Sequence, residues 1–188
     1  MIHTELKKGV QFLFEDQPYE VLESSMMFQG RGSSTVSARI KNLKTGKVLS
    51  RTFHTGENFD EAELTKLQMK YLYNHRDKFV FCEAHNPSKR MEFTQEQLGD
   101  AIRFMKANEV VEGVVFQDEI ITVAFPIKVQ LKVTEAPPGF RGNTVQGGTK
   151  SVKLETGTML DVPLFVQEGD AIEINTETAE YSRRIGKE

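Results

Sequence analysis

The sequence has a single cysteine, no tryptophan and no long hydrophobic run. The lone thiol, Cys82, excludes an intrachain disulfide and a cysteine-based metal cluster, as is usual for proteins of the cytosol. The longest apolar stretches, such as residues 79–82 and 162–166, are too short to cross a membrane. The opening residues, MIHTELKKGV, lack the apolar segment of a signal peptide. We therefore expect a cytoplasmic protein with no membrane segment.

Residue patterns for catalysis or metal binding are scarce. The histidines are scattered, and no HxxxH or CxxC spacing would place two metal ligands on one face. Cys82 alternates with Phe81 and Glu83 in an apolar segment, which favours a buried, inert thiol over a nucleophile. The glycine-rich segment 139–150, GFRGNTVQGGTK, lacks the lysine–hydroxyl ending of the phosphate-binding loop in nucleotide hydrolases. We expect a protein that is not an enzyme and needs no metal or cofactor.

An excess of positive charge is also missing, since the formal net charge is −3. Such an average is unusual for a protein that binds nucleic acid. The charges are unevenly distributed, however, because residues 31–51 contain no acid and six bases: Arg31, Arg39, Lys41, Lys44, Lys47 and Arg51. This run either presents one basic face to a phosphate backbone or forms a solvated hairpin whose charges maintain solubility. Charge alone leaves both interpretations open.

Alternation of apolar and polar residues predicts that most of the chain is β-structure. Val36, Ala38 and Ile40, for example, alternate with polar residues, and the turn KTG at 44–46 leads into a returning strand at 48–53. Similar short segments occur at 10–14, 19–22, 67–73, 78–84, 90–93, 129–133 and 171–185. Short strands at this spacing are typical of small β-barrels.

One helix interrupts the β pattern. Thr94, followed three residues later by Gln97, resembles a capping box, and apolar residues at helical spacing follow. We therefore predict a helix at 95–105. Breaks in the alternating pattern divide the remainder, so we predict an all-β fold of three small barrels, at residues 1–63, 64–127 and 128–188.

The C-terminal third carries a motif that resembles a known family. The segment 150–170, KSVKLETGTMLDVPLFVQEGD, closely resembles the signature of bacterial translation elongation factor P. The resemblance extends over essentially the whole chain, including TEAPPGFRGNT, YLY, and the sequence GRG followed by Thr45-Gly46. Two motifs depart from the family pattern, at three residues, without changing the spacing. Ser151-Val152 replaces the usual Pro-Ala, and Asn143 replaces the usual aspartate.

The resemblance implies both a fold and a function. Members of this family have an N-terminal SH3-like (KOW-type) barrel followed by two OB-fold barrels, arranged in an L that mimics tRNA in outline. They bind the 70S ribosome between the peptidyl and exit sites, contact peptidyl-tRNA and rRNA, and promote peptide-bond formation at polyproline stalls. They are not enzymes themselves. We expect this chain to act in the same way, as a monomer.

Arg31 is the first candidate functional residue. Gly30 and Gly32 permit a tight hairpin turn that would leave Arg31 pointing outward, with Ser33 completing the tip loop. By resemblance, Arg31 occupies the position of the family's functional tip residue, which is a lysine in many members and an arginine in others. The lysine form is extended by β-lysine, and in one arginine-bearing group the side chain is rhamnosylated, so an arginine-modifying glycosyltransferase is a candidate partner. The alternative is an ordinary turn residue.

The third barrel offers further candidates for ribosome or tRNA binding. By resemblance, Asn143 and Thr144 approach the exit-site codon, and exposed amides and cations of the same loop, including Arg141, Gly142 and Lys150, could contact a phosphate backbone. In the final hairpin, Tyr181, Arg183 and Arg184 either contact RNA or pair across strands.

Two alternatives to the leading interpretation stay open. One is the elongation-factor-P-like paralogue of the family. The other is an unrelated OB-fold protein that binds oligonucleotides. The lack of tryptophan and the few aromatic residues in the OB-like parts argue against a platform that stacks single-stranded bases.

Overall fold

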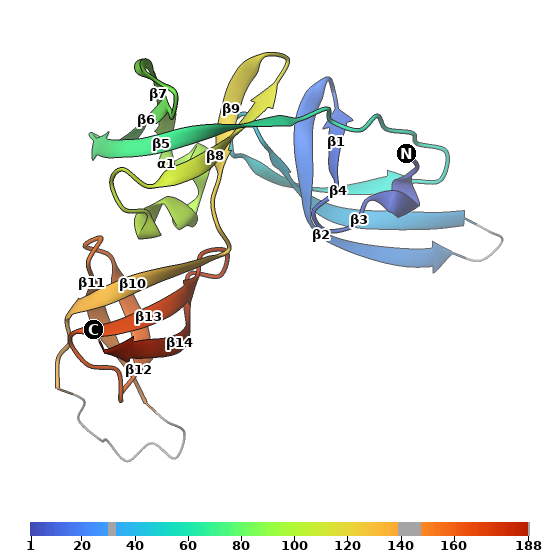
Figure 1. The fold of residues 1–188 in the computed structure, drawn as a ribbon. Helices are drawn as coiled ribbons and strands as arrows, with labels where there is room; N and C mark the ends of the chain where they lie inside the picture. Colours follow the sequence, from blue (N-terminus) through green and yellow to red (C-terminus); the bar gives the residue numbers. More distant parts are fainter. Residues whose placement is uncertain (30–32, 139–147, 188) are drawn as a thin grey trace.

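The computed structural model describes residues 1–29, 33–138 and 148–187, which fold mainly as strands in three sheets (Figure 1). The first sheet contains β1 (Gln11–Phe14), β2 (Gln17–Gln29), β3 (Ser33–Asn42) and β4 (Val48–His54). The second contains β5 (Thr65–His75), β6 (Lys78–Glu83), β7 (Asn86–Thr94), β8 (Val110–Phe116) and β9 (Glu119–Ala124). The third contains β10 (Lys128–Glu135), β11 (Thr149–Leu154), β12 (Met159–Pro163), β13 (Asp170–Asn175) and β14 (Glu180–Lys187). The all-β prediction is confirmed.

The first sheet is an antiparallel meander that folds around an aromatic core. Phe12 and Phe53 are fully buried and meet edge to face, with ring centroids 5.9 Å apart. Phe59 packs edge-on against both rings, at 5.4 and 5.1 Å. Such T-shaped contacts are the favoured geometry for aromatic pairs. The hairpin of β2 and β3 continues beyond this core, as far as the pair Gln29 and Ser33.

The second and third sheets share one strand order. In the second, β5 lies between β6 and β8, and β7 and β9 form the edges; in the third, β10 lies between β11 and β13, and β12 and β14 form the edges. This connectivity is that of the five-stranded, partly open OB barrel. In the second unit a short helix, α1 (Gln95–Leu98), contacts both edge strands, whereas β12 and β14 contact each other directly. The prediction of two OB barrels is confirmed.

The helical segment is shorter than predicted. The capping box forms, because Gln97 Oε1 accepts the Thr94 N–H at 2.9 Å and Thr94 Oγ1 accepts the Gln97 N–H at 3.4 Å. The α-helix nevertheless ends at Leu98, since Gly99 adopts a φ of 77° that is incompatible with a continuing helix. A 3₁₀ helix, η2 (Asp100–Phe104), follows. The prediction of helical structure at 95–105 is thus correct for residues 95–98 and 100–104, but these form two short helices separated by Gly99 instead of one.

Strands β8 and β9 depart in part from the alternation of buried and exposed residues. β8 and β9 contain consecutive apolar residues, such as Val114-Val115 and Ile120-Ile121, because parts of both faces are covered. One face packs into the second barrel, and Val114 and Ile121 pack against the first unit. A segment that is buried on two sides shows no two-residue period.

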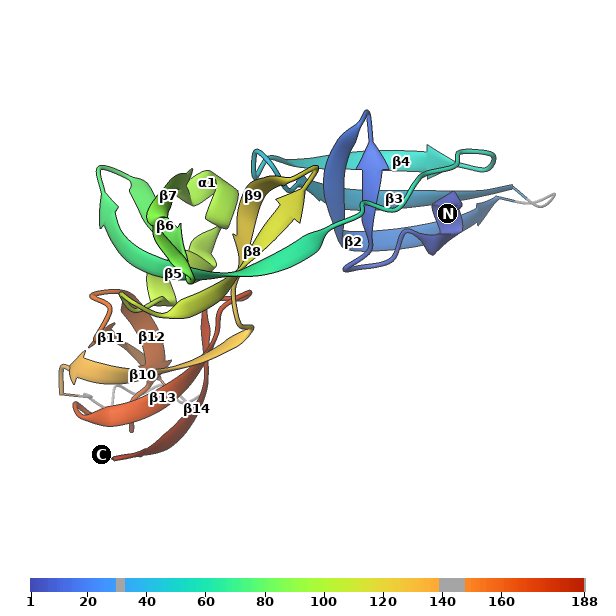
Figure 2. The same ribbon diagram turned by 45° about the horizontal axis from the view of Figure 1, so that its top comes forward.

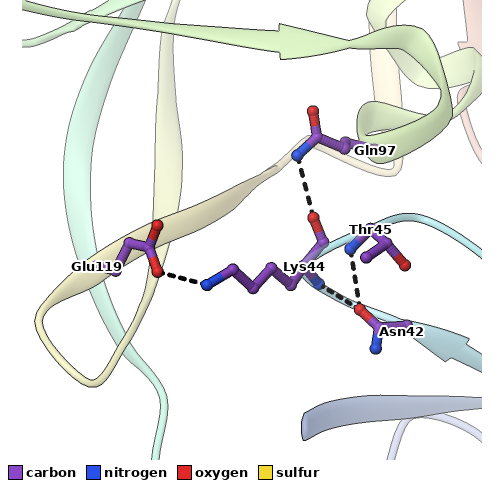
Figure 3. Close-up of polar contacts among 5 residues, drawn as sticks. All are labelled: Asn42, Lys44, Thr45, Gln97 and Glu119. Atoms are coloured by element: carbon purple, nitrogen blue, oxygen red, sulfur yellow. Dashed lines mark hydrogen bonds and ion pairs between the residues drawn. The ribbon is translucent and has the colours of Figure 1, made fainter.

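The turn after β3 joins the first unit to the second (Figure 3). Asn42 Oδ1 accepts the backbone N–H groups of Lys44 and Thr45, both at 2.9 Å, and so fixes the turn. The Lys44 carbonyl oxygen accepts a hydrogen bond from Gln97 Nε2 at 3.0 Å, and Lys44 Nζ lies 2.7 Å from a Glu119 carboxylate oxygen. Polar contacts from α1 and β9 thus hold the turn on the second barrel.

An apolar contact accompanies these hydrogen bonds. Leu43 is 6% exposed and clusters with Val114 and Ile121 of the second barrel. Gly46 has a φ of 80°, and a Cβ at this position would overlap the carbonyl oxygen of Glu96. Only glycine allows the turn to approach the second unit this closely.

The third unit shares a core with the second. Their buried apolar residues form one continuous cluster. Thr158 Oγ1 donates to the Arg103 carbonyl oxygen at 2.7 Å, and Thr176 Oγ1 donates to the Pro126 carbonyl oxygen at 2.6 Å. Both views show the first and second units side by side and the third below the second, so the outline is an L (Figures 1 and 2).

Replacing Gly46 with alanine should destabilise the protein through the junction. The variant suffers both the strain of a positive φ and the overlap with Glu96, whereas Gly56→Ala is a matched control with strain alone, because Gly56 has a φ of 98° and no atom within 4 Å of a Cβ. We expect Gly46→Ala to lower the midpoint of thermal unfolding about 4 °C further than Gly56→Ala, measured by calorimetry. Equal shifts would contradict the close contact.

Candidate functional site

A long two-stranded arm leads to the predicted tip. Strands β2 and β3 pair without interruption from Glu23–Arg39 to Gln29–Ser33, at the end of the first unit remote from the second (Figure 1). The predicted tip residues Gly30, Arg31 and Gly32 lie outside the described residues, and of Ser33 the structure describes the backbone, at the start of β3. The outward orientation of Arg31 stays a prediction, and the arm is the described part of this site.

The outer end of the arm is anchored at Ser34. Its hydroxyl oxygen lies 2.8 Å from Nε2 of His3, in the 3₁₀ helix η1 (His3–Glu5). Thr55 Oγ1 accepts the Ser34 N–H at 3.0 Å and donates to the Ser34 carbonyl oxygen at 2.9 Å. Three hydrogen bonds from two remote segments therefore restrain β3 next to the tip. Sequence reasoning missed this anchor because its members are far apart in the chain.

Acidic side chains lie beside part of the described basic run. Glutamates of β2 lie beside cations of β3. Arg39 Nη1 lies 3.0 Å from Glu23 Oε1, and Lys41 is opposite Glu20. Burial raises the pKa of Glu20 and lowers the pKa of Lys41, so this pair is partly desolvated. The acids are distant in sequence but adjacent across the strands. Part of the positive charge is therefore neutralised within the sheet.

Three consecutive large apolar side chains line the outer arm. Met26, Met27 and Phe28 are 39%, 59% and 82% exposed. Since side chains alternate along a strand, Met26 and Phe28 share one face and Met27 lies on the other. Met26 is opposite the buried Val36, so Phe28 lies beyond the end of the core. The sequence shows that these apolar residues precede a tip flanked by glycines, but it does not show that their side chains are exposed.

Lys150 is the described member of the predicted loop contact in the third unit. Arg141, Gly142, Asn143 and Thr144 lie outside the described residues. In β11, Lys150 Nζ donates to the Pro137 carbonyl oxygen at 3.0 Å, which joins the segment after β10 to the start of β11. The ammonium group retains two further protons that could bind a ligand.

Tyr181 and Arg184 meet beside an exposed aromatic ring. The Tyr181 and Phe165 rings are edge-on with centroids 6.4 Å apart, and the Arg184 guanidinium lies 5.7 Å from the Phe165 centroid. Arg184 also lies 3.6 Å from a carboxylate oxygen of the buried Asp170. Phe165 is 57% exposed, so this surface is open to a partner. Sequence reasoning missed Phe165 because it belongs to an apolar run.

Other chemistry is limited in the described part of the chain. It contains no group of three or more histidine, cysteine, aspartate or glutamate side chains that could hold a metal ion. The prediction of a buried thiol is confirmed, since Cys82 is 2% exposed. None of the helices in the described ranges is long and apolar enough to span a membrane. The described surfaces are suited to recognition by hydrogen bonds, charge and stacking.

The described fold is one four-stranded unit followed by two five-stranded OB units. Three family models match the chain in succession: the elongation factor P KOW-like domain at residues 3–59, the elongation factor P OB domain at 64–123 and the C-terminal domain of elongation factor P at 129–184. The chain belongs to the elongation factor P family, whose members are translation factors and not enzymes. The resemblance seen in the sequence is confirmed.

Full-length relatives agree with these matches. A protein of Thermodesulfovibrio yellowstonii named elongation factor P is 37% identical over 186 residues, which cover 98% of this chain and 99% of the relative. One of Carboxydothermus hydrogenoformans with the same name is 37% identical over 98% of this chain and all of the relative.

A solved structure of eukaryotic translation initiation factor 5A from Methanococcus jannaschii aligns with a TM-score of 0.48 and 12% identity, over 66% of this chain and 92% of that one.

The pKa of Glu173 offers a test of the charge network on β13 and β14. Its carboxylate oxygens lie 3.0 Å from Arg183 Nη2 and 3.2 Å from Lys128 Nζ. Hydrogen bonds from Arg183, and then from Lys128, lower the pKa of Glu173. A lowered folded-state pKa stabilises the protein above the unfolded-state value of about 4.3, and this stabilisation is lost as the pH falls through the folded-state pKa.

We expect Arg183→Gln to raise the pKa of Glu173, measured by NMR titration of the carboxyl group. Unfolding should also become less dependent on pH in the acid range, because less stabilisation remains to be lost. Arg184→Gln is the matched control, since this guanidinium faces Asp170 instead. An unchanged pKa of Glu173 in the Arg183 variant would show that the pair does not persist in solution.

Proposed function

We propose that this protein binds the 70S ribosome between the peptidyl and exit sites and promotes peptide-bond formation when synthesis stalls at consecutive prolines. Membership of the elongation factor P family over nearly the whole chain carries the proposal. The L-shaped outline supports it, because such a body could enter a preformed RNA cavity by shape, as a tRNA does (Figure 1). A net charge of −3 is compatible with this mode, since local contacts suffice.

In this proposal the arm delivers Arg31 to the acceptor end of the peptidyl-tRNA. A guanidinium has five N–H donors in a planar fork, and the phosphate and ribose oxygens of RNA accept such bonds. Restraining the acceptor end lowers the entropic cost of reaching the reactive geometry, and the factor itself transfers no proton. The anchor at Ser34 and the turn at Lys44 support this role because they restrain both ends of β3.

The third unit would provide the remaining contacts with tRNA and rRNA. We propose that Arg141, Gly142, Asn143, Thr144 and Lys150 contact the RNA backbone, and that Tyr181 and Arg184 form a second contact. The functional units would be residues 1–63, 64–127 and 128–188. The protein would act in the cytoplasm as a monomer without a cofactor, and a glycosyltransferase would be the enzyme that modifies Arg31.

Arg31→Ala should abolish most of the rescue while leaving stability nearly unchanged. Arg31 stands between two glycines in the sequence and is not expected to contact the core. The free energy of unfolding should therefore change by less than about 0.5 kcal/mol, as is usual for a surface site. Arg31→Lys should restore rescue only in part, because an ammonium lacks the planar fork of the guanidinium. The measurement is in vitro synthesis of reporters with and without a triple-proline insert.

The reporter without prolines controls for general translation, and thermal unfolding controls for folding of each variant. Wild-type protein from its native host should be used, with its intact mass recorded, so that any modification of Arg31 is known. Full rescue by Arg31→Ala would show that Arg31 is only a turn residue. Failure of the wild type to sediment with 70S ribosomes, combined with binding to free oligonucleotides, would favour the alternative of an oligonucleotide-binding OB protein.

A further inference from the structure

Phe28 is the most exposed of the large apolar side chains in the described part of the chain, at 82%. We propose that its ring stacks on an unpaired nucleobase of the RNA that the arm contacts. This inference rests on the proposed function, because it requires the arm to enter an RNA cavity. It adds a contact with a base to the contacts with phosphate and ribose proposed for the tip.

The ring has no structural role in the described fold. Phe28 pairs with Ser34 across the strands, and this small side chain leaves the ring uncovered. The core on this face ends at Val36 and Phe53, which are 2% and 0% exposed. In residues 1–29, 33–138 and 148–187, no aromatic ring packs against Phe28, whereas Phe12, like Phe53, contacts several rings.

The backbone that carries the ring is nevertheless restrained. The Ser34 backbone is held by Thr55 and its side chain by His3, so the strand facing Phe28 is restrained on both sides. Phe28 itself belongs to the regular β2–β3 ladder. A flat ring on a restrained strand loses little conformational freedom on stacking, which favours the contact.

The size of the apolar surface favours a nucleobase over a protein partner. A phenylalanine buries about 150–250 Å² when it is covered completely. A stable protein interface buries roughly 1,200–2,000 Å² in total, or about 800 Å² on each partner, which is more than Phe28 and its partly covered methionine neighbours could supply. One aromatic ring is, by contrast, the usual partner of one stacked base.

The polar surroundings fit RNA as well. The described outer arm, residues 24–28 and 33–38, has no acidic side chain that would repel phosphates. On its opposite face, a shallow groove of about 410 Å³ is lined by hydroxyls that include Ser25, Ser37 and Thr52, and also by Arg51 and the ion pair of Glu23 and Arg39. Hydroxyl groups such as these are frequent donors to phosphate and sugar oxygens. A base could thus stack on one face while hydroxyls on the other meet the backbone.

Four variants test the stacking in the triple-proline reporter. Phe28→Tyr keeps an aromatic ring, Phe28→Leu keeps only apolar bulk, and Phe28→Ala removes both. Met27→Ala is the matched control, because this side chain is also exposed but lies on the other face. We expect Leu and Ala to raise the concentration for half-maximal rescue about tenfold, and Tyr and the Met27 variant to remain near wild type. Wild-type behaviour of Phe28→Leu would overturn the proposal.

A photo-crosslink identifies the partner directly. p-Benzoylphenylalanine at position 28 is irradiated on 70S ribosomes that carry peptidyl-tRNA, and the adduct is digested with ribonuclease or protease. An adduct that ribonuclease shortens supports the stacking, whereas an adduct to a ribosomal protein, or none at all, overturns it. If the wild type fails in the reporter, the proposed function fails while the crosslink still decides the contact. If the wild type rescues and both Phe28→Leu and Phe28→Ala match it, the stacking alone is wrong.

Discussion

The contact between the turn after β3 and the second barrel determines where the arm points. Strand β3 ends in this turn, so any rotation there would be transmitted along the strand to the tip. The exposed Lys44–Glu119 ion pair contributes little by itself, because solvent screens it. The stronger restraints are the burial of Leu43, the hydrogen bond from Gln97 to the Lys44 carbonyl oxygen, and the close approach that Gly46 permits. These contacts act on the backbone and so leave less freedom than a surface ion pair.

The remaining architecture extends this constraint in both directions. Towards the tip, the hydrogen bonds of His3 and Thr55 to Ser34 restrain the far end of β3. Towards the third unit, a shared hydrophobic cluster continues the second barrel, and Thr158 and Thr176 each bond to a backbone carbonyl of the preceding unit. A body restrained at each junction can be recognised by its shape. This property suits a factor without a catalytic cluster in its described residues, because positioning is then its main contribution.

Local patterns in the sequence predict the local features of this fold. The features that these patterns miss depend on contacts between residues that are far apart in the sequence, or on backbone conformation. The cap at Thr94 is a contact between residues three apart, and it is correct. The break at Gly99 depends on a backbone conformation that helical spacing does not reveal. The neutralisation of Arg39 by Glu23 depends on strand register, including a bulge in β2, and so cannot be read from a list of charges. The sequence does not reveal the exposure of Phe28, because apolar residues in a strand usually belong to the core.

The most direct test of the account is a cryo-electron microscopy structure of the factor on ribosomes stalled at consecutive prolines. The account predicts the three units between the peptidyl and exit sites, in the L-shaped arrangement found here, with the end of the β2–β3 arm at the acceptor end of the peptidyl-tRNA. A complex in which the factor binds elsewhere, or in which the arm points away from the acceptor end, would contradict it.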